Sequence, residues 1–97
     1  MQIKSARRWV VVFDDFKNES ATTSTVAFIK QQDALDFAEK CLLAFRDKDF
    51  VVQGLTAPIV DMDIGKAKAE TNGYALLDTG KKVVQTAKVY PVRVQVD

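Results

Sequence analysis

The chain has 97 residues and a mass of 10.8 kDa, so we expect one compact domain over residues 1–97. Hydrophobic residues make up 47% of the chain and charged residues 28%, a composition typical of globular proteins and not of disordered tails. The 14 basic and 13 acidic side chains give a net charge of +1, which argues against binding a polyanion through the whole surface.

Residue types that serve many enzymes and metal sites are scarce. There is no histidine and one cysteine, Cys41, so the chain cannot build a Ser–His pair, an internal disulfide or a zinc site of four Cys and His ligands. We therefore expect no enzyme activity, no cofactor and no metal. The apolar runs are too short for a membrane span or a signal peptide, which predicts a cytoplasmic protein without membrane contact.

The first half of the chain predicts two strands and a helix. Residues 9–13 form a continuous apolar run, typical of a central strand that is buried, or nearly so, on both faces. Residues 17–24 are small and polar and predict a loop, and residues 25–29 predict a second strand, antiparallel to the first. Apolar residues recur at helical spacing over residues 33–46, which predicts a helix with one apolar stripe.

Two leucines, Leu35 and Leu43, lie beside the main stripe of this helix. They either widen the stripe or face a partner as an exposed apolar patch.

The middle of the chain leaves two alternatives open. Residues 50–52 open a third strand, with Gly54 and Pro58 marking a bend or a bulge. Residues 64–72 fit either a strand that enters a turn at Asn72-Gly73 or a short helix.

The end of the chain predicts a hairpin and a last strand. Residues 74–77 and 82–89 flank a turn at residues 78–80. Residues 92–96 alternate apolar and polar side chains, and Pro91 places this strand at an edge or a bulge. The order β-β-α-β-β-β predicts an α+β fold, an antiparallel sheet of about five strands with one long helix packed on one face.

One short motif resembles a known active site. Residues 75–80 read Ala-Leu-Leu-Asp-Thr-Gly and resemble the active-site strand and turn of retroviral aspartic proteases, which implies Asp78 as one carboxylate of a pair shared by two copies. In that family a second apolar–apolar–Gly segment follows, whereas the 17 residues after Gly80 contain none. Asp and Gly are also favoured turn residues, so we interpret the motif as a hairpin turn.

Two groups of residues are candidates for binding. An unpaired strand edge offers backbone N–H and C=O groups to another chain, and self-pairing gives a two-fold dimer. The candidate interaction site at the predicted edge strand consists of Tyr90, Val92, Arg93, Val94 and Gln95. The candidate site for an anion or a nucleic acid consists of Arg7, Arg8, Lys81 and Lys82.

The expected function is that of a small non-enzymatic interaction protein. We expect an adaptor, regulator or inhibitor that binds a protein partner and forms a homo-oligomer, a profile common among small bacterial and phage proteins. One alternative is an oligomer that binds a small ligand or nucleotide between its subunits. Another is a nucleic-acid-binding module, which the near-zero net charge and the missing RNA-recognition aromatic consensus disfavour.

Overall fold

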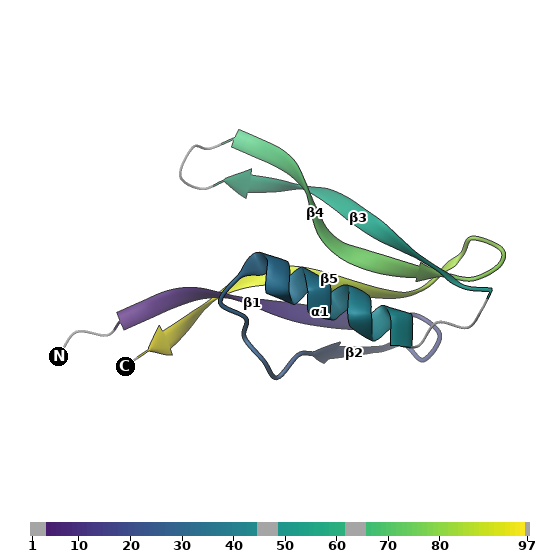
Figure 1. Ribbon diagram of the computed structural model, residues 1–97, viewed down its shortest axis with the longest axis horizontal. Helices are drawn as coiled ribbons and strands as arrows, with labels where there is room; N and C mark the ends of the chain where they lie inside the picture. Colours follow the sequence, from purple (N-terminus) through teal and green to yellow (C-terminus); the bar gives the residue numbers. More distant parts are fainter. Residues whose placement is uncertain (1–3, 45–48, 62–65, 97) are drawn as a thin grey trace.

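The computed structural model describes residues 4–44, 49–61 and 66–96, with side chains described outside residues 57–71. The elements are β1 (Lys4–Asp15), β2 (Ser20–Thr23), α1 (Gln31–Ala44), β3 (Val51–Asp61), β4 (Lys66–Leu77) and β5 (Val83–Val96). The strands form one antiparallel sheet in the order β2-β1-β5-β4-β3, and α1 packs against one face of it (Figure 1). The predicted α+β fold and its element order are confirmed.

The core lies between α1 and the middle of the sheet. Ala34, Ala38 and Leu42 of α1 are fully buried, because their helical spacing puts them on one face of the helix. They pack against buried side chains of three strands: Val11, Leu76, Ala87 and Val89. Within the described part of the chain, no helix is long and apolar enough to cross a membrane.

The two leucines beside the helical stripe differ in their surroundings. Leu35 is 7% exposed and belongs to the core, whereas Leu43 is 42% exposed. The apolar patch that could have contained both is therefore not formed. The helix begins at Gln31, before the predicted residue 33, and the predicted end at residue 46 lies outside the described residues.

The second strand lies earlier in the chain than predicted. Residues 20–23 pair with β1, whereas residues 25–29 contribute a single bridge between Phe28 and Trp9. Val26 is 51% exposed and Ile29 is 70% exposed, so burial does not stabilise the apolar run as a strand. Tertiary pairing beside the turn after β1 outweighs the local β propensity.

β4 settles the alternative left open for residues 64–72 in favour of a strand, and residues 64 and 65 lie outside the described range. The predicted turn at Asn72-Gly73 is wrong, because β4 continues through both residues. Gly73 is required by close packing, since an added Cβ would overlap the backbone carbonyl oxygen of Ala87. The register between β3 and β4 shifts between Leu55 and Thr56, near the predicted bend or bulge, and the extra residue is Asn72 of β4.

β5 is the middle strand of the sheet. The described strands flank it on both sides only as far as Lys88, so the predicted C-terminal edge is limited to the last part of a central strand. β5 continues through Pro91 and pairs with β1 from Gln85 to Val96. On its other side β5 pairs with β4 from Val83 to Lys88. Beyond Lys88, β4 and β3 together bend away from β5 (Figure 1). Among the described strands, none pairs with that side of β5 after this point.

The prediction that the first strand is buried on both faces is also wrong. Val11 is fully buried under α1, whereas Val10 and Val12, which point to the opposite face, are half-buried. Among the described elements, no helix or further strand packs on that face, although Ala75 and Thr86 are buried there, where β4 pairs with β5.

Candidate interaction surface

The outer ends of β1 and β5 form a two-stranded ribbon that extends past α1 (Figure 1). We call this ribbon the arm; it consists of residues 4–8 of β1 and residues 92–96 of β5, paired from Lys4↔Val96 to Arg8↔Val92. The molecule measures 54 × 29 × 22 Å, with a radius of gyration of 15.1 Å. A compact chain of about 100 residues has a radius of gyration of about 13 Å, so the molecule is elongated.

Hydrogen bonds beside the arm fix the direction of its backbone groups. The N–H of Trp9 donates to the carbonyl of Phe28 and the N–H of Phe28 donates to the carbonyl of Trp9, both at 2.8 Å. The backbone groups of Trp9 thus point away from β5, so its pair with Pro91 has no ladder hydrogen bond. By the two-residue period of a strand, the N–H and C=O groups of Arg93 and Gln95 point to the free side of β5. Pro91 fits inside the strand because its missing N–H would also lie on that side.

One face of the arm is entirely polar. Ser5 lies opposite Gln95, and Arg7 lies opposite Arg93. All four side chains are exposed. They share the face of Trp9, since the Arg7 guanidinium carbon lies 6.0 Å from the centroid of the Trp9 ring.

The opposite face of the arm is mainly apolar and continues onto the uncovered face of the sheet. Its half-buried residues in the arm are Ala6, Arg8, Val92, Val94 and Val96. Val10, Val12 and Tyr90 extend the same face towards the middle of the sheet, and Tyr90 is 43% exposed. We call this continuous surface the uncovered face.

The predicted interaction residues are thus divided between two faces. Tyr90, Val92 and Val94 lie on the uncovered face, whereas the side chains of Arg93 and Gln95 lie on the polar face.

The predicted cation site is not brought together. Arg7 and Arg8 point to opposite faces of β1, and Lys81 and Lys82 belong to the turn before β5, at the far end of that strand. Lys82 lies eleven positions before Arg93, the partner of Arg7, a distance of about 35 Å along the strand. Arg93, which the prediction assigned to the other site, is the cation that pairs with Arg7.

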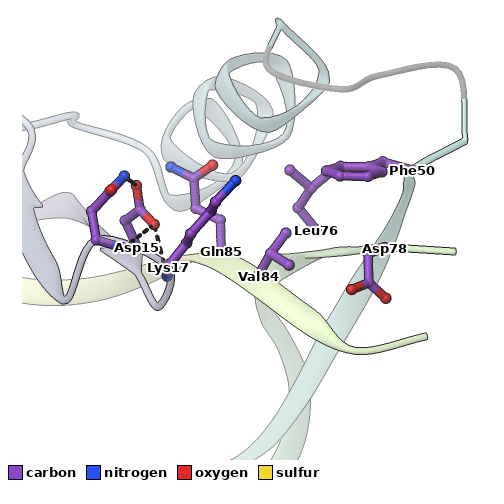
Figure 2. A pocket seen from close by; sticks show the side chains of 8 residues that line it. Asp15, Lys17, Phe50, Leu76, Asp78, Val84 and Gln85 are labelled. Carbon is purple, nitrogen blue, oxygen red and sulfur yellow. Dashed lines mark hydrogen bonds between the residues drawn. The ribbon is translucent and has the colours of Figure 1, made fainter. Parts of the chain in front are cut away.

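A hollow of about 360 Å³ opens at the other end of the sheet (Figure 2). Asp15 and Asp78 lie on opposite sides of it, with apolar side chains, among them Leu76 and Val84, between them. Two carboxylates beside an apolar hollow are a possible acid–base pair, so their hydrogen bonds decide how the site can be used.

Both carboxylates hold turns of the backbone. Asp15 accepts hydrogen bonds from the N–H of Lys17 at 3.0 Å and from the side-chain amide of Asn18 at 2.7 Å. The side-chain and backbone hydrogen bonds from Asn18 lower the pKa of Asp15 from its usual value of 3.8. A general acid near neutral pH needs the opposite shift.

Asp78 also stabilises a turn of the backbone. Its Oδ1 accepts hydrogen bonds from the N–H groups of Gly80 and Lys82, both at 2.9 Å. Lys81 has a positive φ of 61° in this turn. The hairpin turn expected for the protease-like motif is confirmed, with β4 and β5 as its strands. In the ranges that the structure describes, no group of three or more Cys, Asp or Glu residues is placed to hold a metal ion.

The uncovered face and the pairing of Arg7 with Arg93 are not among the features predicted from the sequence. The alternation of apolar and polar residues in the last strand was a usable signal for two distinct faces. The register with β1 could not be inferred from the same pattern.

The chain was compared with known proteins at three levels. No family model matches the chain, and searches of curated proteins and of solved structures find no significant match.

Proposed function

We propose that this chain is a small non-enzymatic interaction protein that binds a second copy of itself through the uncovered face. The observation that carries the proposal is that only one face of the sheet is covered by a helix. α1 packs on one face, and the other presents the side chains of Val10, Val12, Tyr90, Val92 and Val94. Apolar sheet faces pack against one another at about 10 Å, which removes such side chains from water.

The charges on this face favour a second copy as the partner. Asp14, Arg8 and Lys88 point to the same face as the apolar residues and are half-buried. In a two-fold contact both copies use the same surface. A face with charges of both signs can therefore place the acidic group of one copy beside a basic group of the other. The carboxylates of Asp15 and Asp78 accept hydrogen bonds from backbone N–H groups in turns, which supports a non-enzymatic function.

The test is the mass of the native assembly. We expect the protein to sediment at twice the 10.8 kDa of one chain and to give the same mass in a native mass spectrum. Tyr90→Glu should yield monomers, because a buried unpaired charge at the centre of the contact is strongly unfavourable. Ile29→Glu makes the same kind of change at a residue that is 70% exposed outside the sheet and should leave the dimer intact.

Three results would contradict the proposal. One is a protein that remains monomeric at high micromolar concentration, and another is a Tyr90→Glu variant that still dimerises. A small molecule bound in the purified protein would favour the alternative of a ligand-binding oligomer.

A further inference from the structure

We propose that the polar face of the arm binds duplex DNA by entering the major groove. This inference does not depend on self-association, because it concerns the face of the arm opposite to the apolar one. It rests on the charge of the arm, its shape and the kinds of side chain it presents.

The arm carries a concentration of positive charge that the net charge of the chain conceals. Its ten residues include four basic side chains and no acidic one. Arg7 and Arg93 lie on the polar face, whereas Lys4 and Arg8 lie on the opposite face of the same ribbon. The other 87 residues therefore contain 10 basic and 13 acidic side chains. A local basic patch on an otherwise acidic molecule orients the arm, and not the body, towards a polyanion.

The shape of the arm suits a groove. It is a two-stranded antiparallel ribbon that projects past α1 (Figure 1). The major groove of B-DNA is about 12 Å wide and about 8.5 Å deep and admits a two-stranded β-ribbon. Five residues of strand span about 17 Å, or about five base-pair steps.

The polar face offers the side chains that read base edges. Arg pairs with guanine, Gln pairs with adenine, and Ser can bond either base. Ser5, Arg7, Arg93 and Gln95 are all exposed on this one face. Successive side chains on one face of a strand are about 6.8 Å apart, close to two base-pair steps.

The pairing of two arginines also favours an anionic ligand. Arg7 and Arg93 lie directly opposite each other, in the type of pair that brings side chains closest. Like charges in this position destabilise a sheet, and no acidic residue of the arm offsets them. Phosphate groups at the edges of the groove would offset this repulsion in the complex.

Duplex DNA fits this surface better than the other nucleic acids. The major groove of duplex RNA is too narrow for side chains to read. Single-strand binding depends on aromatic side chains that stack on bases, and the arm contains none. The nearest aromatic ring on this face, Trp9, is half-buried and packs against the core.

The experiment is a titration of a labelled mixed-sequence duplex of about 20 base pairs at about 50 mM salt, followed by fluorescence anisotropy. The double variant Arg7→Gln/Arg93→Gln should bind at least about tenfold more weakly than the unchanged protein. The matched control is Lys81→Gln/Lys82→Gln, which removes the same charge at the far end of β5 and should change affinity less than about twofold. Circular dichroism checks that both variants fold, and loss of the Arg7–Arg93 repulsion gives no reason for the first variant to unfold.

Each of the other outcomes would overturn the inference. No binding by the unchanged protein at low salt would do so, as would an equal loss in both double variants, which indicates attraction to net charge alone. Tighter binding to single-stranded DNA or to duplex RNA of the same sequence would identify another ligand. Displacement of the DNA by polyglutamate at an equal charge concentration would identify a general site for acidic chains.

Discussion

The covered and uncovered parts of β1 and β5 share one strand register but have different surroundings. Under α1, Val11 lies opposite Val89 and Phe13 lies opposite Ala87, and these side chains belong to the core or pack against it. In the arm the corresponding pairs on the same face are Arg7 with Arg93 and Ser5 with Gln95, all exposed.

This difference shows that backbone pairing and side-chain burial make separate contributions along one pair of strands. The hydrogen-bond ladder continues through both parts, but a two-stranded ribbon is only marginally stable in water. The arm is therefore held in place by the packing of the covered part, and its own side chains are available for contact with other molecules.

The largest expected effect comes from removing packing in the covered part. Leu42 is fully buried in the core, so Leu42→Ala should lower the free energy of unfolding by about 3 kcal/mol through lost burial and the cavity left behind. Val94→Ala in the arm should lower it by less than about 1 kcal/mol. Urea unfolding of both variants measures the difference.

Leu43→Ala is the matched control, since this residue follows Leu42 in the helix and is 42% exposed. Its substitution should lower the stability by less than about 0.5 kcal/mol. If Val94→Ala were as harmful as Leu42→Ala, the arm would be part of the core and the comparison would fail.

A smaller effect is expected at Tyr74, which packs against the core at the edge of the covered region. Burial, followed by a hydrogen bond to Glu39, raises the pKa of Tyr74 above its usual value of 10.0. Tyr74→Phe removes this hydrogen bond and should lower the stability by about 1 kcal/mol at neutral pH.

The pH dependence gives a second measurement on the same residue. Because the pKa of Tyr74 is raised in the folded state, the unfolded chain releases the proton first. The contribution of this residue is complete below pH 10 and is lost as the pH rises through the folded-state pKa. Thermal unfolding should therefore show a steeper fall above pH 10 for the unchanged protein than for Tyr74→Phe. Parallel curves would contradict the assignment.

The smallest effect is a gain in stability on the face opposite α1. Thr86 is 5% exposed, and its Oγ1 has no hydrogen-bond partner. Thr86→Val keeps the shape of the side chain and removes the unsatisfied group, so the free energy of unfolding should rise by about 0.5 kcal/mol. Thr86→Ser keeps the hydroxyl and should not be stabilising. A loss of stability in Thr86→Val would show that the hydroxyl has a hydrogen-bond partner in solution, such as a buried water molecule.

The local patterns that were sufficient for prediction are those with a regular period or a strong turn signal. The helical spacing of Ala34, Ala38 and Leu42 places α1 correctly within a few residues. The Asp78–Gly80 segment forms the turn of the last hairpin, because its side-chain and backbone hydrogen bonds are local.

The patterns that failed depended on partners distant in the sequence. Val26 and Ile29 lie in an apolar run that no described strand extends or covers, so their β propensity had no effect. Pro91 indicated an edge, but in an antiparallel strand every second N–H points away from a given neighbour. The missing N–H of Pro91 lies on the free side of β5, and the strand still occupies the middle of the sheet.

The sequence by itself determined the helix, the order of the elements and the α+β class, because these follow from the periods of burial along each segment. It left residues 64–72 open between a strand and a helix and placed the second strand too late in the chain. Strand order and register were decided by the tertiary structure, since they depend on which segments meet in space. The alternation of residues 92–96 already separates apolar from polar side chains, but only the register places the apolar ones beside Val10 and the polar ones beside Arg7. The candidate interaction surface is a product of the register, and a strand pattern without its partner cannot specify it.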